Sequence, residues 1–167
     1  MHTVEQLVDM DFSNILTVLA IAASPVSELR GAIPVAVSVY NFPWYHAFRI
    51  GVIGNIIPVP FILLFLNAIV RQLSRVHFLE RFMRWFLEHA RRRGQLIERS
   101  EGAGLVLFVS VPLPVTGAWT GSIIAVLLGL RFRYALLSII AGILIAGIIV
   151  TSATMLGWTL FGLIKID

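Results

Sequence analysis

An acid and a base stand two residues apart inside an apolar stretch near the start of the sequence. Residues 24–34 read SPVSELRGAIP and contain Glu28 and Arg30, between the apolar runs ILTVLAIAA and VAVSVY. A carboxylate surrounded by hydrocarbon can bind and release a proton, and a guanidinium carries a fixed positive charge that attracts anions. The other polar or helix-interrupting candidates in the segment are Ser27, Gly31 and Pro34. The segment therefore offers a proton-binding group beside an anion-attracting group.

A second interrupted segment lies in the other half of the chain. Residues 111–121 read VPLPVTGAWTG and separate the apolar runs GLVLFVS and SIIAVLLGL. Its candidate ligand-contacting residues are Pro112, Pro114, Thr116, Gly117 and Trp119. The Thr116 hydroxyl and the Gly117 N–H could donate hydrogen bonds to an anion. The Trp119 ring could stack on a substrate or simply pack against its neighbours.

The composition places both segments in a membrane. Of the 167 residues 58% are apolar and the mean hydropathy is +0.90, against about 45–50% apolar residues in soluble domains. Cysteine is absent and the four histidines lack ligand spacing, so we expect no metal and no cofactor. No phosphate-binding loop, serine elbow or zinc-protease motif occurs, which argues against an enzyme. We expect one all-α membrane domain over residues 1–167, with no nucleic-acid partner.

The elements that carry the first segment can be read in two ways. As one span, residues 12–40 would hold two charges near the bilayer centre, at roughly 2.5–3.5 kcal/mol each, and two prolines in a helix interior. As a re-entrant hairpin, residues 12–23 and 31–40 would form two helices of about 18 and 15 Å, each reaching halfway into the membrane. Irregular backbone at that depth is tolerated where it lines a cavity. The sequence favours the hairpin.

The two halves of the chain resemble each other in pattern. Repeat 1 covers about residues 12–71 and repeat 2 about residues 103–164, each an interrupted hairpin followed by a long span. Gly31 aligns with Gly117 at an offset of 86, and Gly54 with Gly142 at an offset of 88. An odd number of crossings per repeat makes the repeats inverted, which would bring both hairpin tips to the bilayer midplane. Interruptions at matching positions of two halves are typical of a transporter binding site.

A basic connector of about residues 72–102 joins the repeats. Its apolar residues recur at helical spacing, which predicts an amphipathic helix on the membrane surface or against the protein's own spans. With hairpins, ten arginines fall on one side of the membrane, against one arginine and one lysine on the other. The bias indicates a multi-pass protein of the cell membrane with a cytoplasmic connector and external termini. Four plain spans would place the termini in the cytoplasm.

Other small or polar residues are expected to serve helix packing. Asn55 and Asn67 in the first span could face a cavity, but an interhelical hydrogen bond is the simpler interpretation. The residues expected to form a close helix contact are Gly142, Ala146, Gly147 and Thr151.

The stretches SELRGAIP and PLPVTGAWTG resemble the signature segments of the small multidrug export protein family, which is similar to the DedA/VTT superfamily of membrane transporters. The resemblance covers about residues 14–162. It implies two re-entrant hairpins and two spans in inverted repeat. The functional positions that it implies are Glu28, Arg30, Pro112, Pro114, Thr116 and Gly117. DedA relatives are associated with moving phospholipids or undecaprenyl phosphate, although the first tip here lacks their paired glutamates.

Three functions are compatible with these residues. The favoured one is a proton-coupled carrier or flippase for an anionic amphiphile, such as a polyprenyl phosphate or phospholipid, at the meeting tips. The second is export of lipophilic cations in exchange for protons at Glu28. The third is a passive lipid scramblase or structural protein in which Glu28 and Arg30 simply pair. The expected partners are membrane lipids, an amphiphilic or lipid-linked phosphate ligand and protons, with homo-oligomers left open.

Overall fold

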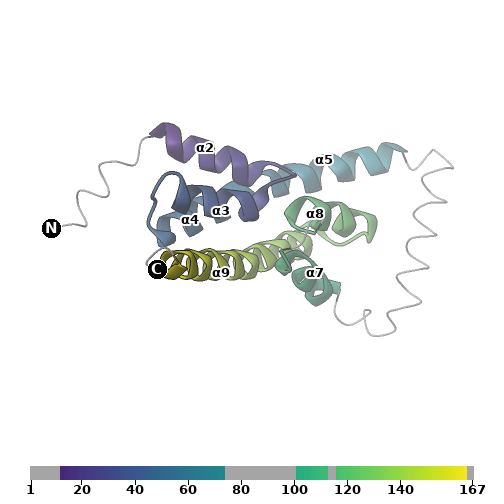
Figure 1. Cartoon of the computed structure of the whole chain (residues 1–167). Helices are drawn as coiled ribbons and strands as arrows, with labels where there is room; N and C mark the ends of the chain where they lie inside the picture. The colour runs from purple at the N-terminus through teal and green to yellow at the C-terminus, as the bar shows by residue number, and fades with distance from the viewer. Residues whose placement is uncertain (1–11, 74–100, 113–115, 165–167) are drawn as a thin grey trace. The chain divides into compact units, whose positions relative to one another are not determined.

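The computed structural model describes residues 12–73, 101–112 and 116–164, and every element in these ranges is a helix (Figure 1). The helices are α2 (Phe12–Ala23), α3 (Glu28–Ser38), α4 (Trp44–Ile56), α5 (Pro58–Leu73), α7 (Glu101–Ser110), α8 (Ala118–Leu127) and α9 (Phe132–Ile164). The all-α prediction is confirmed for these ranges. The predicted connector helix falls almost entirely outside the described residues, as does Pro114.

The chain divides into two compact units. The first contains α2, α3, α4 and the part of α9 from Ile143 onward, and the second contains α5, α7, α8 and the part of α9 up to Gly142. Each unit therefore contains a pair of short helices, α2 and α3 or α7 and α8, and the start of the helix that follows that pair, α4 or α9. Each unit also contains a helical segment from the other half of the sequence, the later part of α9 in the first unit and α5 in the second.

In the first unit, α2 and α3 fold back on one another and both pack on α4 (Figure 1). The apolar run of α2 ends at Ala23 because Ser24-Pro25 follows, and proline cannot continue the hydrogen-bond ladder. The contact between α2 and α4 is very close: a Cβ added to Gly54 would lie 2.7 Å from the Ala22 Cβ and 2.9 Å from the Leu19 carbonyl oxygen. Glycine at this position therefore sets the separation of the two helices.

The second short helix starts earlier than the sequence predicted. Residues 31–40 were expected to form it, but α3 begins at Glu28 and includes both Gly31 and Pro34. The turn shrinks to four residues, 24–27, because the Glu28 N–H already bonds the Ser24 carbonyl at 3.2 Å. Pro34 removes only the bond to the carbonyl four residues back, a loss that membrane helices tolerate.

In the second unit, α8 packs on both α5 and α7. The beginning of α9 closes on α7 through Gly142, where an added Cβ would lie 2.6 Å from the Val109 Cβ and 3.0 Å from the Val106 carbonyl oxygen. Gly54 and Gly142, which are 88 residues apart, thus make the same kind of contact with the first short helix of their own repeat.

The ends of the two short-helix pairs share this spacing of 88 residues. Trp44 begins α4 and Phe132 begins α9. A left-handed residue precedes each start, Asn41 with φ 52° and Gly129 with φ 70°. In the described residues each half of the chain thus has two short helices followed by a long apolar stretch.

The pairing of Gly31 with Gly117 is corrected by the position of each residue in its helix. Gly117 is the N-cap of α8, and its carbonyl accepts the Gly121 N–H at 2.8 Å. In the first repeat the N-cap is Ser27, and its carbonyl accepts the Gly31 N–H at 3.0 Å. Gly31 and Gly117 therefore occupy different positions: Gly31 lies in the first turn of α3, whereas Gly117 precedes α8.

Two stretches are long and apolar enough to cross a membrane. They are Trp44–Leu66, with 23 residues, and Phe132–Gly157, with 26 residues. Large apolar side chains are exposed on these helices, including Phe61 and Phe65 at 69% and 68%. Such a surface is unusual for a soluble protein and ordinary for one bathed in lipid.

Candidate functional site

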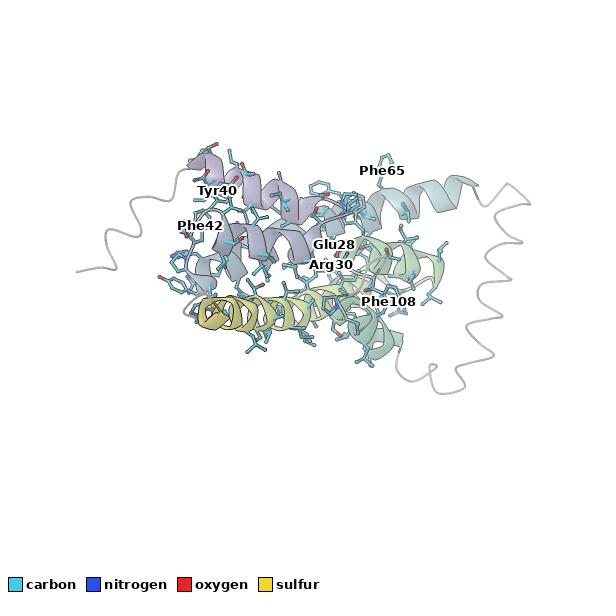
Figure 2. All side chains as sticks on the ribbon, viewed as in Figure 1. Glu28, Arg30, Tyr40, Phe42, Phe65 and Phe108 are labelled. Atoms are coloured by element: carbon cyan, nitrogen blue, oxygen red, sulfur yellow. The ribbon has the colours of Figure 1, made fainter. Side chains whose placement is uncertain are left out.

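The first tip, which we define as residues 24–31, joins α2 to α3. Glu28 opens α3 and is only 6% exposed, whereas Arg30 is half-buried. Figure 2 shows Glu28 and Arg30 at the same end of α3, with Tyr40 and Phe42 at the other end of this helix pair. The structure thus brings the acid and the base of the sequence motif to one end of one helix.

The backbone of the first tip is strained at Glu28. Its φ is +47°, in the left-handed region that side chains other than glycine and asparagine seldom adopt. Such strain is of order 1–3 kcal/mol and clusters at functional sites. The neighbouring turn has no spare room, because a Cβ added to Gly31 would lie 2.9 Å from the Ser27 Cβ. The tip therefore presents a buried carboxylate on a tightly constrained backbone.

Ser27 stands at the N-terminus of α3 without capping it through its side chain. Ser27 is the N-cap residue, but its hydroxyl makes no capping hydrogen bond to the first turn. Helix N-termini carry unsatisfied N–H groups and a partial positive charge. A negative charge beside this end is therefore stabilised, whether it belongs to Glu28 or to a ligand.

A polar residue of the first span, Asn55, is buried one position after Gly54 on α4. On α4, Gly51 faces Leu29 of α3 and Gly54 faces Ala22, the penultimate residue of α2, so the next residue is level with the tip. Asn55 is 2% exposed, and its Oδ1 has no hydrogen-bond partner among the described residues. The interhelical bond expected from the sequence is therefore not made by this oxygen. Asn67, the other asparagine weighed, lies outside the residues whose side chains are described.

The second tip, residues 111–117, joins α7 to α8. Gly117 is buried and has φ 150°, a conformation that only glycine adopts without strain. The Thr116 hydroxyl donates to the Val111 carbonyl at 2.6 Å, so it closes the turn. Pro112 is half-buried where α7 ends. The sequence missed this local role of Thr116, which depends on how the turn folds back.

Trp119 stands in the first turn of α8 and lines an apolar groove within the second unit. The groove has a volume of about 440 Å³, and α5 supplies most of its wall through residues such as Phe61 and Phe65. Behind it the buried Ser122 hydroxyl donates to the Ala118 carbonyl at 2.6 Å. Trp119 therefore packs beside an apolar wall, and stacking on a substrate stays a prediction.

The site residues are thus held in two sets, one at each tip. Ser27, Glu28, Arg30 and Gly31 share the first tip, and Pro112, Thr116 and Gly117 share the second, with Trp119 just beyond it. Within the described ranges no group of three or more histidine, aspartate or glutamate side chains could hold a metal ion.

The described residues combine short paired helices with two apolar stretches that are long enough to cross a membrane. A sequence profile of the family described as "Putative small multi-drug export protein" matches residues 28–149 of 167, which include residues 28–31 of the first tip and all of the second tip. The chain belongs to this small multi-drug export family. Neither a search of curated proteins nor a search of solved structures finds a match.

Proposed function

We propose that this protein is a proton-coupled transporter of amphiphilic small molecules, with Glu28 as the proton-binding group. The observation that carries the proposal is the burial of Glu28 at the start of α3 in a membrane-protein family named for export. Ionisable residues inside membrane proteins are rare and mark proton and substrate pathways. A role for Glu28 in scaffolding alone would not require the left-handed backbone that it adopts.

The charge state of Glu28 would determine whether an anion can bind at the N-terminus of α3, because few other charged groups lie near it. Of the helices packed on α3, α2 carries no titratable side chain, and α4 carries Tyr45, His46 and Arg49 in its first two turns, away from the tip. Arg30 is therefore the nearest fixed charge in the described part of the first unit. The N-terminus of α3 stabilises one negative charge well, and a second one beside it is repelled.

Because only one negative charge is stabilised at this helix end, binding of an anionic substrate would require protonation of Glu28. When Glu28 is ionised, its carboxylate occupies the field of the α3 N-terminus. When Glu28 is protonated, Arg30 and the partial positive charge of the α3 N-terminus are left to attract an anion. An anionic amphiphile, such as a polyprenyl phosphate or a phospholipid, would thus bind together with a proton and be carried with it.

The membrane topology belongs to the same proposal. The four short helices α2, α3, α7 and α8 contain 10–12 residues each, about 15–18 Å, which is half of a hydrocarbon core of about 30 Å. Two re-entrant hairpins in an inverted repeat would place both tips at the midplane, with a cytoplasmic connector. The matched spacing of 88 residues supports the repeat. The relation to the DedA/VTT superfamily stays a prediction.

Export of lipophilic cations is the second candidate, and the family description favours it. In this mechanism ionised Glu28 binds the cation and exchanges it for a proton, so the two would move in opposite directions. Arg30, two residues away at the same end of α3, opposes a cation. The two candidates therefore differ in the direction of the coupled proton.

Reconstitution into proteoliposomes with a pH-sensitive dye tests the function. Addition of a short-chain polyprenyl phosphate should drive proton movement in the same direction as the substrate, and Glu28→Gln should abolish it while Glu101→Gln should not. Proton movement opposite to a lipophilic cation such as tetraphenylphosphonium would establish the second candidate. Equilibration of lipid with no proton movement, unchanged in Glu28→Gln, would identify a passive scramblase and refute the proposal.

A further inference from the structure

The turn between α3 and α4 carries a cluster of aromatic side chains, which we call the aromatic turn (residues 40–46). The Trp44 and Tyr45 rings meet edge to face with their centroids 5.8 Å apart, and the Tyr45 and His46 rings lie 4.6 Å apart. The Trp44 side chain is 56% exposed. Figure 2 shows Tyr40 at the end of α3 opposite to the first tip, so the aromatic turn and the first tip are separate.

The aromatic turn marks a boundary between lipid and water. Residues 39–43 are not helical, and exposed backbone of this kind does not occur inside the hydrocarbon layer. Tryptophan and tyrosine are enriched at this boundary, because their rings are apolar and their N–H or O–H groups are polar. The turn separates two apolar segments whether the first segment is a hairpin or a plain span. It therefore reaches a membrane surface in either topology.

Arg49 lies on the exposed side of α4, inside the first spanning stretch. It follows Trp44 by five residues, or about 7.5 Å of helix. Ile53, one turn further on, is 55% exposed on the same side, whereas Gly51 and Gly54 face the short helices. A guanidinium among lipid tails is strongly disfavoured. The charge of Arg49 must therefore be brought back to the membrane boundary.

The geometry of the helix directs Arg49 toward this boundary. Helical side chains tilt toward the N-terminus of their helix, and Tyr45 and His46 precede Arg49 by four and three residues on the same face. Long arginine side chains reach past apolar surface in this way to place their charge in a polar layer. The acidic side chain of the described part of the first unit is Glu28 alone, and it opens α3 at the first tip. The described residues of this unit therefore offer Arg49 no acid near the aromatic turn.

The second repeat has no charge at the matching position. Counted from the helix start, the place of Arg49 in α4 is taken in α9 by Leu137, which is 65% exposed. Leucine is ordinary on a surface that faces lipid, whereas arginine there is costly unless its charge is compensated. Helix packing does not require Arg49 either, because the side chain is exposed. The charge at this position is thus explained by a partner in the membrane.

We propose that Arg49 binds the phosphate of an anionic phospholipid at the membrane boundary. The guanidinium offers a fork of N–H donors that matches phosphate oxygens, and the Tyr45 hydroxyl, one turn nearer the boundary, is a further donor. The partner is a lipid because the exposed surface that continues from Arg49 to Ile53 is apolar and suits an acyl chain. This site lies at the other end of α3 from Glu28 and does not depend on the proposed transport.

Photocrosslinking in phosphatidylcholine nanodiscs tests the site in the full chain. Two probes are compared, a phosphatidylglycerol and a phosphatidylcholine with the same diazirine near the carboxyl end of one acyl chain, and labelled residues are mapped by mass spectrometry. The phosphatidylglycerol probe should label residues 44–49 about fivefold more, which is the effect of one basic side chain beside anionic lipid. This preference should fall as salt is raised. Equal labelling by the two probes would overturn the proposal.

Arg49→Leu, which copies the residue of α9 into α4, should remove the preference, and Arg49→Lys should keep most of it because the charge remains. Arg133→Gln is the matched control: it removes an exposed arginine from the start of α9 and should leave the labelling of residues 44–49 unchanged. A preference that persists in Arg49→Leu, or that Arg133→Gln removes, would contradict a site at Arg49. A preference abolished by inorganic phosphate, but not by chloride of the same ionic strength, would make free phosphate the ligand and refute the lipid.

Discussion

Replacement of Gly54 by alanine is expected to force α2 away from α4. The new Cβ would lie 2.7 Å from the Ala22 Cβ and 2.9 Å from the Leu19 carbonyl oxygen. Neither neighbour is the flexible end of a long side chain, so the helices themselves must separate. Overpacking of this kind destabilises by about 1–3 kcal/mol. Alanine also gains about 0.8–1 kcal/mol of helix propensity over glycine, so the net loss of unfolding free energy is about 0–2 kcal/mol.

A control glycine on an open helix face isolates the steric part of this change. Gly104 lies within α7, and a Cβ added there meets nothing within 4 Å, so Gly104→Ala should be neutral or stabilising by up to about 1 kcal/mol. The difference between the two variants is then the cost of the close contact, about 1–3 kcal/mol. Gly142→Ala, with its Cβ 2.6 Å from the Val109 Cβ, should behave like Gly54→Ala.

The assay is reversible unfolding in detergent micelles, followed by circular dichroism. All three variants keep the same composition apart from one methyl group, so their unfolding free energies can be compared directly. If Gly54→Ala is as stable as Gly104→Ala, α2 does not lie against α4 as described. If Gly54→Ala is destabilised and Gly142→Ala is not, the two repeats do not close on their long helices in the same way.

Three further substitutions test the tips. Glu28→Gly should be more stable than Glu28→Ala by about 1 kcal/mol, because glycine adopts φ +47° without strain, and thermal unfolding of the pair measures it; equal stability would exclude the left-handed conformation. Asn55→Leu should change the free energy of unfolding by no more than about 1 kcal/mol, because it removes a buried oxygen that has no hydrogen-bond partner among the described residues. The same variant should slow transport in proteoliposomes. A large loss of stability would show that Asn55 is structurally paired. Gly117→Ala should lower stability by about 1–3 kcal/mol, since its φ of 150° disfavours a Cβ, and an unchanged melting temperature would contradict that geometry.

The fold could be predicted where a single local signal decided it. The end of α2 at Ala23 follows from an apolar run stopped by Ser24-Pro25, and this end agrees with the structure. The start of α3 could not be predicted in the same way. Its first residues, Glu28 to Gly31, have the composition of a loop, and their contact with α4, where Leu29 lies against Gly51, cannot be seen in the sequence.

The register of the repeats shows a related limit. The dipeptide Gly-Ala occurs at residues 31–32 and 117–118, and this identity suggested an alignment of the two halves. The N-caps, Ser27 for α3 and Gly117 for α8, show that the two dipeptides lie at different positions relative to the helix start. The candidate residues at the first tip could be named from the sequence because charge is rare in an apolar stretch. The buried oxygens of Asn55 and Thr151, which have no partner among the described residues, could not be predicted, since each depends on whether a neighbouring helix supplies a hydrogen-bond partner.

The side of the membrane on which the C-terminus lies decides between hairpins and four plain spans. In the described residues α2 and α3 are separate helices of 12 and 11 residues that pack on each other, so neither can cross a hydrocarbon core alone at 1.5 Å per residue. If both hairpins are re-entrant, only the two long stretches cross, and the arginine bias places the C-terminus outside the cytoplasm. A phosphatase fused after Asp167 should therefore be active in a bacterial host, and a fluorescent protein that folds only in the cytoplasm should stay dark. The opposite pair of signals would mean that α2 and α3 open into one continuous span, which would remove the first tip from the membrane midplane and the structural basis for an anion site there.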